Sequence, residues 1–152
     1  MADSNIEILK KETYLKVIEN SVNSKIFNSL FIQFKDSGEV KDIMNDGEYS
    51  CAFFVSSILF LIGVLNKHVA TVQSLRKLIE EDNKWKRVEV VQIEAGDVVF
   101  WDKIKYEDGS ENAHVGFVLN KEEAISTDYK QKMILQHKIG ERPITDIYRY
   151  SW

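Results

Sequence analysis

The chain has 152 residues, enough for one domain of ordinary size and too few for two full domains. Hydrophobic residues make up 44% and charged residues 29%, which excludes intrinsic disorder and low-complexity or collagen-like structure. The 20 Lys and Arg residues are outnumbered by 24 Asp and Glu residues, giving a net charge of -4 with no basic run. We therefore expect no nucleic acid partner.

Residues 6–35 are expected to be helical, as one long helix or two short ones. The stronger pattern is the set of apolar residues that recur at helical spacing: Ile26, Phe27, Leu30, Phe31 and Phe34. Gly38 is a natural helix stop, and the sequence Asn-Asp-Gly at 45–47 predicts a tight turn. We interpret residues 1–45 as an N-terminal helical extension and residues 46–152 as the main domain.

A second helix is expected from Ser50, a good N-cap, to Gly63, a plausible C-terminal stop. It is apolar nearly all round and should lie in the core. A third helix should begin after Thr71 and end near Asn83. At residues 52–65 the most apolar window is shorter than the roughly 20 residues that span a bilayer, so we expect no membrane span.

The second half of the chain has a sequence pattern typical of β-strands. Short β-branched or aromatic runs, separated by turn residues, occur at residues 88–93, 97–101, 114–119, 131–136 and 144–150. These runs predict a small antiparallel sheet. Helices followed by strands indicate an α+β fold, with a buried helix packed on the sheet.

Cys51 is the only cysteine, which excludes an internal disulfide and a zinc site with several cysteine ligands. It falls in the first turn of the second predicted helix, where unpaired N–H groups and the helix dipole favour a thiolate. The same N–H groups could receive the oxyanion of a tetrahedral intermediate. The alternative is a small core residue, because free cysteine is often buried.

A thiol nucleophile needs a general base, and the chain offers His68, His114 and His137. The best placed is His114, at the start of an alternating strand pattern in which Gly116 leaves room for a second backbone or a substrate. His68 lies in a polar connector. The alternative for a lone histidine is a structural or exposed role.

An orienting acceptor for the His114 ring is expected in the next strand, where alternation places Ser126 and Asp128 on one side. Asp128 is the chemically better partner because it is charged, and Ser126 is the second choice. A zinc site built from Cys51 and the three histidines lacks any short ligand spacing. We therefore expect neither a metal nor another cofactor.

Three segments in this order resemble the papain-like NlpC and CHAP group of cysteine peptidases and amidases. They are YSCAFFV at residues 49–55, AGDVVFW at 95–101 and AHVGFVL at 113–119, and the resemblance covers roughly residues 46–136. It implies a papain-like fold with Cys51 as nucleophile, His114 as base and Tyr49 lining the site. Two departures are Ser50, where the family commonly has Asp, and a third polar position that falls near Ser126. We assign Tyr49 and Ser50 to substrate binding.

The resemblance implies a cysteine-dependent hydrolase that cleaves an amide bond in a peptide, such as a peptidoglycan fragment. The acidic and polar N-terminus is unlike a secretion signal, so we expect a cytoplasmic protein or one released by a lysis system. The alternative is a catalytically inactive papain-like module that binds peptide or glycan. A third hypothesis makes residues 1–45 an interaction arm that covers the groove. The sequence does not indicate an oligomeric state.

Overall fold

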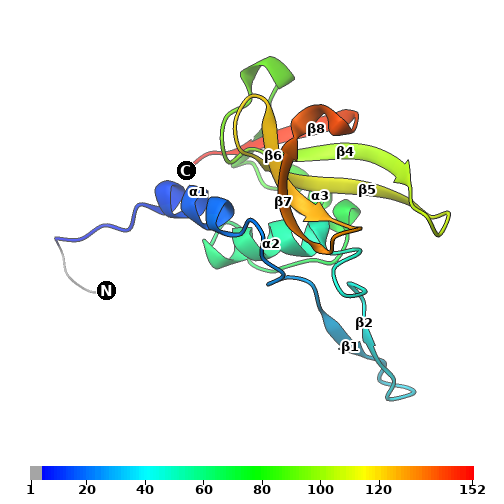
Figure 1. The fold of residues 1–152 in the computed structure, drawn as a ribbon. Coiled ribbons are helices and arrows are strands. Elements are labelled where there is room, and N and C mark those ends of the chain that lie inside the picture. The colour runs from blue at the N-terminus through cyan, green and yellow to red at the C-terminus, as the bar shows by residue number, and fades with distance from the viewer. Residues whose placement is uncertain (1–4) are drawn as a thin grey trace.

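The computed structural model describes residues 5–152. Residues 1–4, which contribute to the expected lack of a secretion signal, lie outside the described residues. The described chain contains three α-helices, one six-stranded sheet and one two-stranded sheet (Figure 1). The helices are α1 (Lys10–Asn20), α2 (Cys51–Leu61) and α3 (Val72–Glu81). The strands are β1 (Phe31–Gln33), β2 (Val40–Asp42), β3 (Trp85–Arg87), β4 (Val98–Lys105), β5 (Glu111–Val118), β6 (Glu123–Asp128), β7 (Met133–Lys138) and β8 (Ile144–Tyr150).

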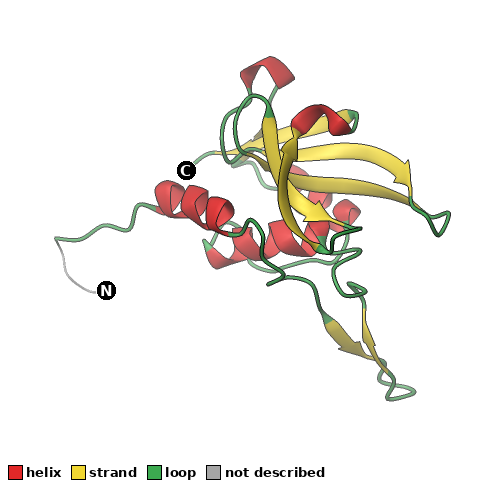
Figure 2. Cartoon of the chain, viewed as in Figure 1, coloured by secondary structure: helices red, strands yellow, loops and turns green. Residues whose placement is uncertain are grey.

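The six-stranded sheet has the order β3-β8-β4-β5-β6-β7, and all its neighbouring strands are antiparallel (Figure 2). The predictions of an α+β fold and an antiparallel sheet are thus confirmed. The expected strand at 88–93 is wrong, because this segment contains the short 3-10 helix η1 (Val90–Gln92). Val90 and Val91 are exposed there, so the β-branched run has no sheet neighbour to pack on.

One feature of the sheet concerns the site directly. β5 pairs with β6 only where Phe117 faces Ile125 and Val118 faces Ala124, close to the hairpin turn. β6 continues to pair with β7 as far as Asp128, whereas β5 pairs with β4 back to Glu111. The β5–β6 ladder therefore ends after these two pairs, and His114 lies on β5 beyond its end.

Helix α2 packs against one face of this sheet, as its apolar sequence predicts. The shared core includes Phe54, Ile58, Phe100, Val115, Phe117 and Ile125. Full burial of such side chains stabilises the fold by about 1.5–3 kcal/mol each. Alternation along the strands sends a second set to the opposite face: Val99, Trp101, Val118, Ala124 and Ile147. The period-two pattern expected for the His114 strand is thus confirmed.

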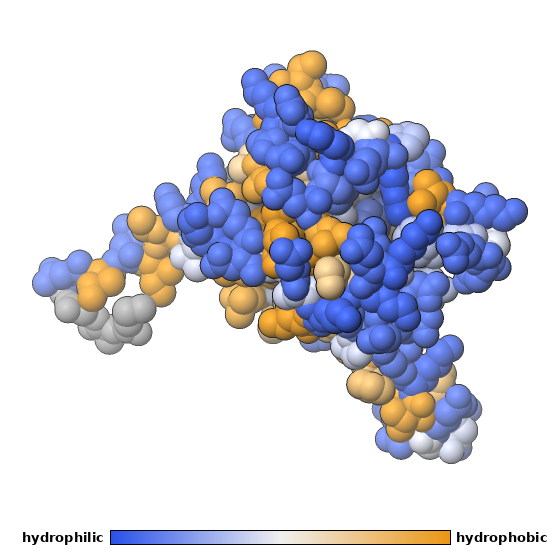
Figure 3. All heavy atoms as spheres, viewed as in Figure 1, coloured by the Kyte–Doolittle hydropathy of each residue, from blue (hydrophilic) through white to orange (hydrophobic). Residues whose placement is uncertain are grey.

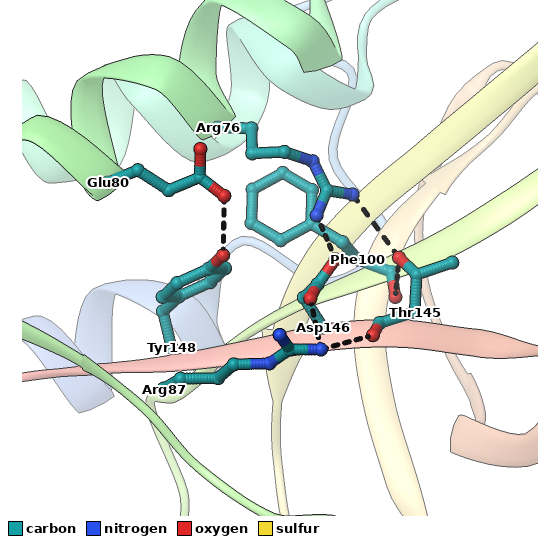
Figure 4. A network of polar contacts seen from close by, with 7 residues as sticks. All are labelled: Arg76, Glu80, Arg87, Phe100, Thr145, Asp146 and Tyr148. Carbon is teal, nitrogen blue, oxygen red and sulfur yellow. Dashed lines mark hydrogen bonds and ion pairs between the residues drawn. The ribbon is translucent and has the colours of Figure 1, made fainter.

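Helix α3 begins after Thr71 as expected, and the Thr71 hydroxyl accepts a hydrogen bond from the Ser74 N–H. Polar contacts bind this helix to the sheet (Figure 4). Arg76 of α3 pairs with Asp146 of β8, and Arg87 of β3 approaches the same carboxylate at 2.7 Å. Asp146 is largely buried, and this network joins α3 to β8.

The N-terminal region differs most from its prediction. Helix α1 forms and buries Tyr14 and Ile18 in the core that contains α2. The prediction of a helix over residues 26–34 is wrong. That segment instead leads into the β1–β2 hairpin, which projects from the body of the molecule (Figure 1). An amphipathic pattern gains most of its helical stability from packing, and Ile26 and Phe31 remain exposed.

A local hydrogen-bond network holds the base of this hairpin. The Asp42 carboxylate accepts from the backbone N–H groups of Leu30, Met44 and Asp46. Apolar side chains stay exposed along this hairpin, as the orange residues in Figure 3 show.

None of the helices within residues 5–152 is long and apolar enough to cross a bilayer.

Candidate active site

Cys51 is the first residue of α2. The first helical hydrogen bond runs from the Phe54 N–H to the Ser50 carbonyl at 2.8 Å, so the N–H groups at the helix start have no partner within the helix. The sulfur contacts the backbone N–H groups of Cys51, Ala52 and Val115. The helix start therefore places the sulfur against the backbone of β5, one residue from His114.

Burial of Cys51, which is 8% exposed, raises the pKa of its thiol. The N–H contacts and the positive charge of Arg142 lower this pKa, but desolvation outweighs them. A helix start was expected to favour the thiolate. The sequence could not reveal how deeply the sulfur is buried, and burial leaves Cys51 a neutral thiol at rest.

His114 lies on β5 opposite Trp101, and its ring packs 5.4 Å from the indole ring. It is only 5% exposed, and burial together with the nearby Arg142 and His137 holds its pKa well below the usual value. Its Nε2 is 2.8 Å from Ser126 Oγ. Its Nδ1 is buried without a hydrogen-bond partner among the described residues, so it makes no hydrogen bond to Cys51 at rest.

The contact with Ser126 continues into a chain of hydrogen bonds. Ser126 Oγ is 2.7 Å from Nε2 of His137, and Nδ1 of His137 is 3.0 Å from the Lys138 carbonyl oxygen. A carbonyl only accepts, so Nδ1 of His137 carries a proton. When this is the only proton on that ring, its Nε2 accepts from the Ser126 hydroxyl. Ser126 in turn accepts from Nε2–H of His114. This order leaves the lone pair of His114 on Nδ1.

The structure brings Ser126, and not Asp128, to the His114 ring. The Asp128 carboxylate instead accepts from the N–H groups of Lys130 at 2.9 Å and Gln131 at 2.7 Å. It therefore stabilises the turn between β6 and β7. A negative charge attracts turn amides as strongly as it attracts an imidazole, and the sequence pattern does not separate these two uses.

The two residues assigned to substrate binding have different surroundings. Ser50 is fully buried, and its hydroxyl donates to the Gly47 carbonyl at 3.0 Å instead of capping α2, so it stabilises the turn before the helix. Tyr49 donates to Asp108 at 3.0 Å, and its ring lies parallel to that of Tyr106. Tyr49 lines a hollow beside Cys51, whereas Ser50 is closed off from it.

Two hollows lie near the site. One of about 360 Å³ is lined by Cys51, Tyr49, Tyr106 and the apolar side chains of Met44 and Val72. Another of about 500 Å³ is lined more by polar groups: His114, Ser126, Asp128, Tyr129, His137 and Arg142. Tyr106 of the first hollow and Tyr129 of the second stack with their ring centroids 3.9 Å apart.

From the sequence, His137 was only one of three candidate bases, and Arg142 had no expected role. His137 reaches Ser126 because β7 pairs antiparallel with β6, with His137 opposite Ala124 and diagonal to Ser126. Alternation within β7 could have pointed to it had the register been known. Arg142 follows the short helix η2 (Ile139–Glu141), and no spacing signal links it to Cys51.

His68 lies apart from this cluster, edge-on against the rings of Phe53 and Phe60. Within residues 5–152, no group of three or more His, Cys, Asp and Glu side chains has the arrangement of a metal site. No family model and no curated protein matches the chain. The chemistry of the site is therefore inferred from its own geometry.

Proposed function

We propose that the protein is a cysteine-dependent hydrolase of papain-like architecture that cleaves an amide bond in a peptide. The observation that carries the proposal is the hydrogen-bond chain from Lys138 through His137 and Ser126 to His114. It leaves an unprotonated Nδ1 on the residue next to Val115, whose N–H contacts the sulfur of Cys51. A base lone pair and a thiol at a helix start are the two groups that thiol hydrolysis requires.

The proposed reaction uses these groups in turn. The Cys51 sulfur attacks the amide carbonyl carbon while its proton moves to Nδ1 of His114, and N–H groups at the start of α2 receive the oxyanion. The imidazolium then protonates the leaving amine, the C–N bond breaks and a thioester remains. Water, deprotonated by His114, attacks the thioester and releases the acid and the free thiol.

The resting protonation states determine how this reaction begins. Burial raises the pKa of Cys51 and lowers that of His114, so both are neutral at pH 7. Proton transfer then accompanies attack on the substrate and does not precede it. Hydrogen bonds of unliganded catalytic groups are often longer than in the substrate complex, so the missing Cys51–His114 hydrogen bond is compatible with this order.

The substrate class follows from the resemblance noted above, and we propose peptides of the peptidoglycan type. The test is release of new amino groups from small cell-wall peptides by wild type, Cys51→Ala and His114→Gln. We expect turnover only in wild type, with all three proteins folded by circular dichroism. Equal turnover in wild type and Cys51→Ala would contradict a thiol mechanism.

A second candidate is an inactive module that binds peptide without cleaving it. The raised pKa of Cys51 and its lack of a hydrogen bond to His114 favour this alternative. Calorimetric titration with the same peptides separates the two candidates. Equal binding by wild type and Cys51→Ala with no turnover in either would support the binding module.

A further inference from the structure

His114 and His137 share one hydroxyl group, that of Ser126. The buried Ser126 Oγ lies 2.8 Å from Nε2 of His114 and 2.7 Å from Nε2 of His137. A serine hydroxyl has a single proton to donate. One ring therefore receives the hydroxyl proton, and the other ring donates its own proton to the oxygen.

Trp101 holds both rings beside this hydroxyl. Its ring centroids lie 5.4 Å from the His114 ring and 5.5 Å from the His137 ring. The indole N–H donates to the Ile139 carbonyl at 2.8 Å, and the indole is buried. The direction of the two hydrogen bonds can therefore reverse while the side chains stay in place.

The hydrogen bonds also fix where a second proton enters His137. Nδ1 of His137 donates to the Lys138 carbonyl at 3.0 Å, so this nitrogen carries a proton in both charge states of the ring. A second proton can bind only at Nε2, which faces Ser126. The His137 side chain is 19% exposed, which gives water access to it. Once protonated, Nε2 donates to Oγ and no longer accepts from it.

The charges around His137 act on this protonation in both directions. The Glu141 carboxylate of η2 lies 3.5 Å from Nδ1, where it can pair with an imidazolium ion. Histidine is the side chain that ordinarily changes charge near neutral pH. The other titratable or charged groups that line the same hollow come from β5, from the turn after β6 and from the segment after η2: His114, Asp128, Tyr129, Lys130 and Arg142.

We propose that His137 is a positioning residue that sets, through Ser126, which nitrogen of His114 carries the proton. With a neutral His137, Ser126 donates to His137 and accepts from Nε2–H of His114. With a protonated His137, Ser126 donates to Nε2 of His114, which loses its Nε2 proton to water and gains one from water at Nδ1. The net change is one proton taken up at Nε2 of His137.

Two observations support this coupling. Nδ1 of His114 has no hydrogen-bond partner among the described residues, so the Ser126 contact alone distinguishes the two tautomers of the ring. If both rings donated to Ser126, its buried hydroxyl proton would lose its acceptor, which is costly. Burial lowers the pKa of His114, so this ring stays neutral while His137 gains its proton.

The consequence for catalysis rests on the proposed function, in which Nδ1 of His114 takes the proton of Cys51. Protonation of His137 places a proton on that nitrogen and removes the base. Peptide cleavage should therefore cease at acid pH with the titration of His137, although His114 itself remains neutral.

Nitrogen-15 NMR of the folded protein tests the coupling without turnover, because a ring nitrogen with a proton and one with a lone pair differ widely in chemical shift. The chain has three histidines, so single variants assign each ring. We expect the His114 proton on Nε2 at about pH 8 and on Nδ1 at about pH 5, with the same midpoint as the titration of His137. A His114 tautomer that stays constant while His137 titrates, or a His137 that stays neutral throughout, would overturn the proposal.

His137→Phe keeps an aromatic ring beside Trp101 but offers Ser126 no acceptor. Ser126 should then donate to His114 at every pH, so we expect the Nδ1–H tautomer of His114 already at about pH 8. The Nε2–H tautomer in folded His137→Phe would contradict the proposal. The wild-type titration tests the same coupling independently of how well this variant folds.

His68→Phe is the matched control, because it makes the same substitution at a ring that packs on two phenylalanine rings outside the site. We expect it to keep the wild-type tautomer of His114 at each pH. Ser126→Ala removes the link, so the His114 tautomer should no longer follow the titration of His137. A changed tautomer in His68→Phe, or continued coupling in Ser126→Ala, would count against the role of His137.

If wild type hydrolyses peptides, kcat extends the test. We expect kcat of His137→Phe at about pH 8 to fall by about 100-fold, because the wrong tautomer removes the general base. A changed tautomer with undiminished kcat would exclude Nδ1 of His114 as the base and end the catalytic role of His137. Absence of turnover in every protein would contradict the hydrolase proposal, whereas the NMR result would still decide whether His137 sets the tautomer.

Discussion

Gly116 of β5 and Ser126 of β6 lie so close that a Cβ atom on residue 116 would be 2.7 Å from the Cβ atom of Ser126. The same added atom would lie 2.6 Å from the Ile125 carbonyl oxygen. The glycine two residues after His114 therefore lets β6 approach until the Ser126 hydroxyl reaches the imidazole. This confirms the expectation that Gly116 makes room for a second backbone.

Gly116→Ala should therefore push β6 away from β5 and lengthen the His114–Ser126 contact. We expect a loss of about 1–3 kcal/mol in the free energy of unfolding, because backbone atoms cannot give way as a flexible side chain can. Urea denaturation measures this loss. Gly140→Ala is the control, because nothing lies within 4 Å of a Cβ there. Equal stability of the two variants would contradict the close approach.

Ser126→Ala should remove the group that orients His114. It leaves Nε2–H of His114 and Nε2 of His137 without their shared partner, so we expect kcat to fall by about 10–100-fold in folded protein. Ser56→Ala is a matched control: Ser56 is equally buried, and its hydroxyl exchanges hydrogen bonds with the Val69 backbone away from the site. We expect it to lower stability and leave kcat per folded molecule unchanged. A full kcat in Ser126→Ala would remove Ser126 from the mechanism.

Asp128→Asn should have little effect on catalysis. The asparagine oxygen can still accept from the Lys130 and Gln131 amides, and the carboxylate makes its hydrogen bonds to that turn. We expect kcat/KM on a neutral peptide to stay within about twofold of wild type, measured beside Ser126→Ala. A loss as large as that of Ser126→Ala would restore Asp128 as the orienting residue.

Local patterns predicted the helices whose apolar side chains find a partner in the core. The apolar run after Ser50 and the cap at Thr71 placed α2 and α3 within a few residues. The helix predicted at 26–34 does not form, because Ile26 and Phe31 have no core surface to pack against. Helical spacing in a sequence does not show whether such a surface exists. Tertiary packing decided that segment.

The candidate site divides in the same way. Cys51 and His114 were found from their positions at a helix start and in a strand pattern. Choosing Ser126 over Asp128 required the register of β6, since alternation places both on one side. The position of Arg142 depends on the path of the chain after β7, and no local sequence pattern predicts that path.

The pH dependence of stability tests the burial of His114. Its pKa in the folded protein lies well below the value of 6.5 expected for an exposed histidine, so the unfolded chain binds more protons as the pH falls through 6.5. Stability is thus fully present above that pH and is lost below it. Each pH unit below 6.5 costs about 1.4 kcal/mol until the folded protein itself becomes protonated.

We expect wild type to lose about 1 kcal/mol more than His114→Gln between pH 7.5 and 5.5 in urea denaturation. The contributions of all other titratable groups to the pH dependence are present in both proteins and cancel in the comparison. Equal acid sensitivity of wild type and His114→Gln would mean that the imidazole can take up a proton in the folded protein. In that case burial would not lower the pKa of His114, and the ring would not be shut off from solvent as it is in the structure.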